Sequence, residues 1–192
     1  FRVTTNGTLT TLYEFIGTDG QEPFGGLLLA SDGNFYGTTL GYGSRDAPYA
    51  TAFRFTPAGE LKTLAKFTAD AGLYPAGGLK LGPDGNFYGT TLIGGTNGMG
   101  TAFRISTNGL LTTLVHFNNA NGGRPRGPLV LAGDLCFYGT TLDGGSNDLG
   151  TVFKVTSGGQ LTTLVNFNGT NGRNPWAGLR LGQDGCLYGC TP

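Results

Sequence analysis

A chain of 192 residues with twelve basic and twelve acidic side chains has zero formal net charge, and these charges are scattered. The absence of a basic stripe argues against nucleic-acid binding, and no apolar run approaches the ~20 residues needed to insert into a membrane. Charged residues make up only 12% of the chain, glycine occupies 37 positions, and 38% of the residues are hydrophobic. This composition argues against disorder and predicts an all-β domain of short strands joined by tight turns.

The first residues, Phe1-Arg2-Val3, match the later run Phe53-Arg54-Phe55. Residues 1–15 are therefore expected to hold the last two strands of a four-stranded unit. The chain begins at Phe1 and lacks an initiating methionine, so we expect a processed or excised piece.

The first full unit is expected over residues 25–67, with four strand-like runs separated by turn signals. A leucine-rich run is followed by Asp32-Gly33, a hairpin signal, and by Phe-Tyr-Gly-Thr-Thr at 35–39. The third run, 51–55, and the fourth, 61–67, complete the unit.

The same order recurs over residues 77–117 and 127–167, and its first half recurs over 177–192. Phe-Tyr-Gly-Thr-Thr returns at 87–91 and 137–141, and a degraded copy lies at 187–191. In the third full unit Asp134-Leu135 replaces Asp-Gly, so we expect that turn to differ or to be strained.

Four short strands in each repeat of about 50 residues are typical of a β-propeller blade. The half-blades 1–15 and 177–192 together make one blade. We therefore expect a single domain of four four-stranded blades, with the ring closed by pairing of the two half-blades, which would remove open strand edges. Two alternatives stay open: two chains joined as eight blades, or an excerpt of a longer array.

The run Gly-Leu-Lys-Leu-Gly-Pro-Asp-Gly-Asn-Phe-Tyr-Gly-Thr-Thr at 78–91 resembles the Gloeobacter/Verrucomicrobia (GloVer) tandem repeat. Gly-Thr-Ala-Phe-Arg-Ile at 100–105 and Leu-Thr-Thr-Leu at 111–114 resemble it too. The resemblance implies a secreted or surface-anchored bacterial protein with no established enzymatic activity, and it brings no functional residues. The closing Cys-Leu-Tyr-Gly-Cys at 186–190 departs from the repeat.

Few residues point to catalysis. The only histidine, His116, has the counterparts Glu14, Lys66 and Asn166 in the other units and is interpreted as a solvated surface residue. The turn aspartates are assigned to hairpin chemistry, because one carboxylate per unit falls short of the six to eight oxygens that calcium prefers. No known catalytic or phosphate-binding motif is present, so we expect no enzyme activity, no metal and no cofactor.

The three cysteines, Cys136, Cys186 and Cys190, are expected to be small and mostly buried thiols. Cys136 and Cys186 occupy equivalent positions of neighbouring units, which leaves a disulfide between them as the alternative.

Variable side chains gather in the connections expected on one face of the propeller. In the segment between blades a proline is constant while its neighbours change, as in Glu22-Pro23-Phe24, Tyr74-Pro75-Ala76, Arg124-Pro125-Arg126 and Asn174-Pro175-Trp176. This segment enters the innermost strand, so these side chains should ring the mouth of the central channel. The predicted ligand-binding residues are Phe24, Tyr42, Tyr74, Arg124, Arg126 and Trp176.

Aromatic side chains beside arginine suit stacking on a sugar or anchoring a protein partner. We therefore predict an extracellular or cell-surface, non-enzymatic binding module for a glycan or protein ligand. The competing interpretation of the same loops is neutral drift, with the aromatic residues covering blade edges.

A structural protein that self-associates into larger rings or filaments through its terminal half-blades is the first alternative function. A polysaccharide lyase or hydrolase is the second. It would depend on the unrepeated acids Glu22, Asp46, Asp143 and Asp148.

Overall fold

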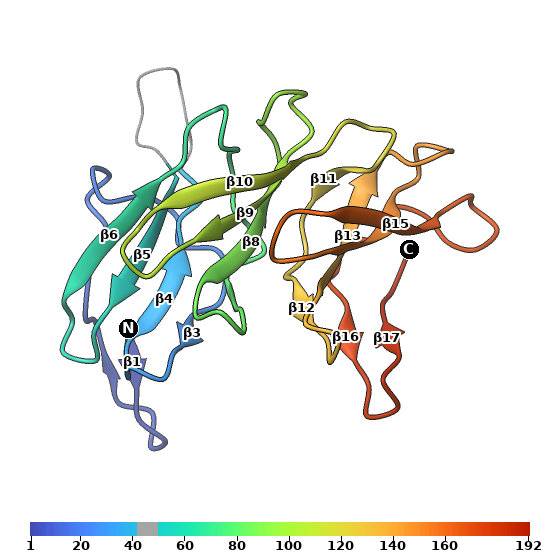
Figure 1. Ribbon diagram of the computed structural model, residues 1–192. Coiled ribbons are helices and arrows are strands. Elements are labelled where there is room, and N and C mark those ends of the chain that lie inside the picture. The colour runs from blue at the N-terminus through green and yellow to red at the C-terminus, as the bar shows by residue number, and fades with distance from the viewer. Residues whose placement is uncertain (42–49) are drawn as a thin grey trace.

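The computed structural model describes residues 1–41 and 50–192, and all their regular secondary structure is β (Figure 1). No helix in this part of the chain is long and apolar enough to cross a membrane. The strands are β1 (Arg2–Val3), β2 (Leu9–Thr10), β3 (Leu28–Leu29), β4 (Phe35–Thr38), β5 (Thr51–Phe55), β6 (Leu61–Lys66), β7 (Lys80–Leu81), β8 (Phe87–Thr91), β9 (Thr101–Ile105), β10 (Leu111–His116), β11 (Gly123–Pro125), β12 (Val130–Leu131), β13 (Phe137–Asp143), β14 (Thr151–Val155), β15 (Leu161–Asn166), β16 (Arg180–Leu181) and β17 (Leu187–Tyr188).

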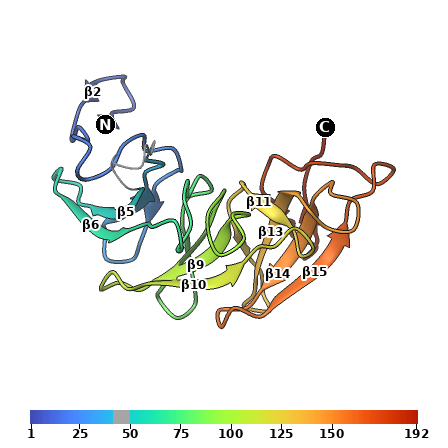
Figure 2. The same ribbon diagram turned by 90° about the horizontal axis from the view of Figure 1, so that it is seen from above.

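Three sheets contain a full set of four antiparallel strands in chain order. The first blade is β3–β6, the second is β7–β10, and the third is β12–β15 with the additional strand β11 on the inner edge of β13. The two-stranded sheets β1–β2 and β16–β17 stand at the two ends of the chain. The sheets lie side by side along an arc (Figure 2).

The expected closure of the ring is not present. Within the described chain, β1 pairs only with β2 and β16 only with β17, so the two half-blades are not joined. The two termini lie at opposite ends of the arc in both views (Figures 1 and 2). The strand complement of a fourth blade is there, but the arc keeps its halves apart.

Neighbouring sheets pack through aromatic pairs that come from the recurring Phe-Tyr. The Tyr36 ring stacks on Phe87 of the next blade with centroids 4.2 Å apart, and Tyr88 stacks on Phe137 at 4.1 Å. Tyr88, Phe87 and Phe137 are each at most 1% exposed. The repeated motif therefore builds the core between blades, which explains why one unit alone could not bury it.

The Asp turn between the first two strands of each blade has a common geometry. Its aspartate accepts a hydrogen bond from the tyrosine hydroxyl of the next strand, as Asp32 does from Tyr36 at 2.8 Å and Asp84 from Tyr88 at 2.7 Å. Leu135 replaces the turn glycine with a φ of 61°, close to the 76° of Gly33. The strain predicted for the third turn is confirmed, because leucine rarely adopts a left-handed backbone.

Glycines line the inner side of the arc, where neighbouring blades approach most closely. A Cβ atom built on Gly25 would lie 2.7 Å from Gly78 Cα, and one on Gly127 would lie 2.4 Å from the Gly178 nitrogen. At least one glycine precedes each inner strand, and Gly25, Gly77, Gly78, Gly127 and Gly178 serve a close contact between neighbouring blades.

Candidate functional site

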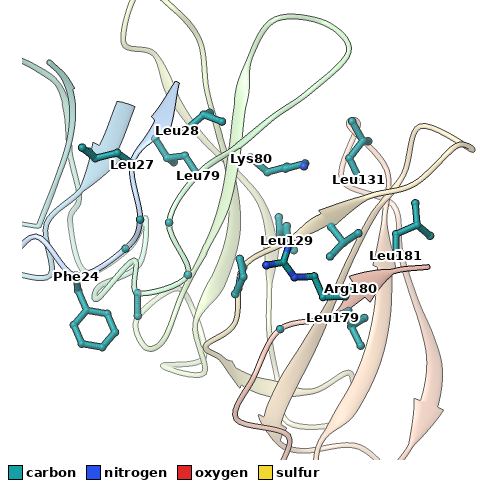
Figure 3. A pocket seen from close by; sticks show the side chains of 18 residues that line it. Phe24, Leu27, Leu28, Leu79, Lys80, Leu129, Leu131, Leu179, Arg180 and Leu181 are labelled. Atoms are coloured by element: carbon teal, nitrogen blue, oxygen red, sulfur yellow. The ribbon is translucent and has the colours of Figure 1, made fainter. Parts of the chain in front are cut away.

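A hollow of about 810 Å³ is bordered by the inner strands of the arc. Each blade and the last half-blade contribute one segment to it: residues 24–28, 76–80, 128–131 and 178–181. Most of these residues are glycines and leucines, so the wall is formed largely by backbone and by aliphatic side chains (Figure 3). We call this space the inner hollow.

Two cationic side chains interrupt that wall. Lys80 begins β7 and Arg180 begins β16, and both project into the hollow in Figure 3. The equivalent residues of the other two segments, Leu28 and Val130, are apolar. Cationic and apolar residues therefore alternate along the arc at this one position.

A second hollow, of about 360 Å³, opens where the connections between blades meet those that follow β4 and β8. Phe24, Tyr74 and Arg126 line it together with Ala76, Leu40 and Leu92. Phe24 and Ala76 also line the inner hollow, so the two spaces are contiguous. We call this second space the mouth pocket.

Trp176, the only tryptophan, adjoins the mouth pocket through its contact with Arg126. The guanidinium carbon of Arg126 lies 4.4 Å from the ring centroid of Trp176, a cation–π contact. Trp176 is 57% exposed and Phe24 is 58% exposed. Four of the six predicted binding residues, Phe24, Tyr74, Arg126 and Trp176, therefore form one continuous surface, which we call the aromatic platform.

The other two predicted residues are placed differently. Arg124 donates a hydrogen bond from Nε to the Asp143 carboxylate, and this ion pair joins β11 to β13. The charge of Arg124 is therefore satisfied within the third blade. Tyr42 lies outside the described residues.

The connections between blades hold their side chains on an unusual backbone. The residue before the constant proline has a left-handed φ in every case: 54° at Glu22, 57° at Tyr74, 53° at Arg124 and 42° at Asn174. Non-glycine residues pay about 1–2 kcal/mol for this conformation. Glycine provides it at many other turns of this chain, yet never here, so each blade presents a side chain where a glycine would fit the backbone better.

The recurring charged groups lie in the Asp turns, at the opposite end of the inner strands from the mouth pocket. Burial and the hydrogen bond to Asp84 raise the pKa of Tyr88 to about 12. The Lys154 ammonium, 2.7 Å from Asp134, holds the pKa of that carboxyl well below its usual range. These contacts agree with the assignment of the turn aspartates to hairpin chemistry.

His116 and the cysteines are also remote from the two hollows. His116 Nδ1 accepts a hydrogen bond from the Thr96 amide at 3.1 Å, so the histidine supports the loop after β8 in addition to facing solvent. Cys136, Cys186 and Cys190 are all free thiols, so the alternative of a Cys136–Cys186 disulfide is wrong for this structure. The expected burial holds only for Cys136, because Cys186 and Cys190 lie on the last half-blade, which no further blade of the described chain covers.

The acids on which an enzyme would depend are not brought together at either hollow. Asp143 is paired with Arg124, and Asp148 accepts a hydrogen bond from the Gly144 amide at 2.9 Å. Glu22 is exposed and lines neither hollow, and Asp46 lies outside the described residues.

Lys80 and Arg180 were not predicted as site residues, because they lie on inner strands whose recurring leucines indicate scaffold, whereas the variable residues stand out in the loops. An alignment of the four repeats at this position reads Leu, Lys, Val and Arg. That departure from an otherwise regular strand was the available signal.

Comparisons with known proteins agree on the architecture. A family model described as the Gloeobacter/Verrucomicrobia repeat matches residues 1–109 and, in a second overlapping match, residues 44–192. No curated protein is significantly similar to the chain. The fold is similar to the crystal structure of an inferred gluconolactonase, with a TM-score of 0.55 and 21% sequence identity over 86% of this chain and 54% of that one. The chain thus spans about half the length of that protein, and the similarity concerns the propeller-like fold.

Proposed function

Because the chain belongs to the Gloeobacter/Verrucomicrobia repeat family, whose repeat covers all of it, we propose that the blades form a rigid scaffold for a non-enzymatic binding site. The ligand is a glycan that lies on the aromatic platform at the mouth of the inner hollow. An extracellular or cell-surface location is part of this proposal, since polysaccharides are most accessible there.

The observation that carries the proposal is the exposure of aromatic rings beside an arginine. Phe24 and Trp176 remain more than half exposed although both are large apolar residues. Aromatic faces suit the apolar faces of sugar rings, and the Arg126 guanidinium keeps N–H groups for hydroxyl oxygens. The platform borders a hollow of the size that small ligands usually occupy.

Trp176 makes the proposal testable by fluorescence, because it is the only tryptophan. Titration with soluble oligosaccharides, chosen from a glycan array, should shift or quench its emission. Trp176→Ala and Phe24→Ala should each reduce retention on the array at least tenfold. Leu110→Ala, which removes a 65% exposed apolar side chain from the β9–β10 turn, is the matched control and should bind normally. Silence of the array, or full binding by Trp176→Ala, would refute the proposal.

The solved neighbour raises hydrolysis of a sugar lactone as the competing activity. Among the described residues that line the two hollows there is no carboxylate and no histidine, and apart from the phenol of Tyr74 the set is cationic, apolar or glycine, which suits binding better than general acid–base chemistry. Gluconolactone hydrolysis above the buffer rate, abolished by Lys80→Gln or Arg180→Gln, would replace binding with catalysis.

Self-association is a second candidate function, and the two ends of the arc favour it. Leu164 and Val165 are exposed beside a hollow of about 390 Å³ that Leu187 also lines. The first half-blade carries exposed Val3 and Leu9, which would complement such a face in another copy. Sedimentation should then show a mass that rises with concentration, and a monomer at all concentrations would exclude it.

A further inference from the structure

Three cations line the two contiguous hollows without a carboxylate partner in the described part of the chain. They are Lys80 and Arg180 in the inner hollow and Arg126 at the mouth. Two other cations of the described chain are paired with a carboxylate, Arg124 with Asp143 and Lys154 with Asp134. The hollows therefore concentrate positive charge in a protein whose formal net charge is zero.

Two of these cations, Lys80 and Arg180, extend into the same inner hollow. Lys80 comes from the second blade and Arg180 from the last half-blade, with the third blade between them. Figure 3 shows both side chains extending from their strands into the hollow, beside Leu129 and Leu131. Aliphatic and glycine walls keep the local dielectric low and strengthen the attraction for an anion that enters.

The hollow and the platform can act on the same molecule, because Phe24 lines both the inner hollow and the mouth pocket. A ligand that stacks on Trp176 and Phe24 and extends inward would meet Lys80 and Arg180. Such a ligand needs ring faces at one end and a negative charge at the other.

We propose that the glycan is acidic, and that a uronate carboxylate occupies the inner hollow between Lys80 and Arg180 while neighbouring sugar rings lie on the aromatic platform. This inference rests on the proposed glycan-binding function. The arginine fork suits a carboxylate because it offers two parallel N–H donors, and the lysine adds a point charge.

The test compares tetragalacturonate with its fully methyl-esterified form, which has the same rings without the charge. Calorimetric titration of the full chain should show at least tenfold tighter binding of the acid. The double variant Lys80→Gln/Arg180→Gln should abolish this preference, whereas Lys62→Gln on the exposed outer strand β6 should keep it. Raising the salt concentration should weaken binding of the acid more than binding of the ester.

The outcomes separate this inference from the proposed function. Equal affinity for acid and ester would overturn the inference and leave glycan binding intact. If tripolyphosphate binds as tightly as tetragalacturonate, the inference is overturned, because negative charge without sugar rings would then be sufficient for binding. If neither oligosaccharide binds and the glycan array is also silent, both the inference and the proposed function fail.

Discussion

Replacement of Gly25 by alanine is expected to destabilise the protein, whereas the same change at the adjacent Gly26 is expected to stabilise it slightly. The two glycines precede the same inner strand, but their surroundings differ. A Cβ on Gly25 would lie 2.7 Å from Gly78 Cα and 2.9 Å from the Gly78 nitrogen, both backbone atoms of the next blade. A Cβ on Gly26 would have no neighbour within 4 Å.

The expected magnitudes follow from these contacts. Overpacking against backbone atoms that cannot rotate away destabilises the folded state by about 1–3 kcal/mol. Alanine also reduces the conformational entropy of the unfolded chain, which stabilises the folded state by about 0.4–1 kcal/mol. Gly25→Ala should therefore lower the free energy of unfolding by about 1–2 kcal/mol. Gly26→Ala keeps only the favourable contribution, so the two variants should differ by about 2 kcal/mol, or about 4–8 °C in melting temperature for a chain of this size.

Urea unfolding followed by circular dichroism measures the difference, with thermal melts as a second readout. The wild type and both variants are compared at one pH and one protein concentration. Equal stability of the two variants would refute the close approach of neighbouring blades at Gly25, and so would a more stable Gly25→Ala.

Two further predictions concern titration and accessibility. The raised pKa of Tyr88, about 12 against an ordinary 10.0, means that its stabilising contribution is complete below about pH 10 and is lost as the pH rises through 12. Tyr88→Phe should cost about 1 kcal/mol at pH 7 by removing the bond to Asp84 and should flatten the loss of stability between pH 10 and 12, as measured by urea midpoints. An unchanged alkaline slope would contradict the assignment. Cys186 and Cys190 are exposed and Cys136 is 8% exposed, so Ellman's reagent should titrate two thiols rapidly in the folded protein and the third only after unfolding.

Much of the fold was predictable because the same strand and turn motifs recur in every blade. Phe-Tyr-Gly-Thr-Thr predicted the central strands β4, β8 and β13, and these are buried because they pack between neighbouring sheets. The inner strands were overestimated, since only two residues of each pair as a regular ladder, as at Leu28–Leu29. Glycines before them, such as Gly25 and Gly127, make contacts between blades, which a single unit's sequence does not reveal.

Ring closure was not predictable from strand counting. The two half-blades contain the right strands, but their meeting depends on how far each blade rotates relative to the last. That rotation is set by contacts such as Gly25–Gly78 and Tyr36–Phe87, which only the assembled arc defines.

The candidate site was predictable in part. The constant proline marked the connections that carry Phe24, Tyr74, Arg126 and Trp176, and these residues do gather. Arg124 could not be separated from Arg126 by sequence, because its pairing with Asp143 depends on the register of β11 against β13.

The left-handed residue before each constant proline has a consequence for engineering. Its backbone shape is the same with Glu, Tyr, Arg or Asn in place, so the scaffold tolerates a change of side chain at this point. The residue after the proline varies as freely, as Phe24, Ala76, Arg126 and Trp176 show. The four connections thus offer eight positions that accept different side chains. A combinatorial library confined to them would sample new ligand specificities while leaving every core residue untouched.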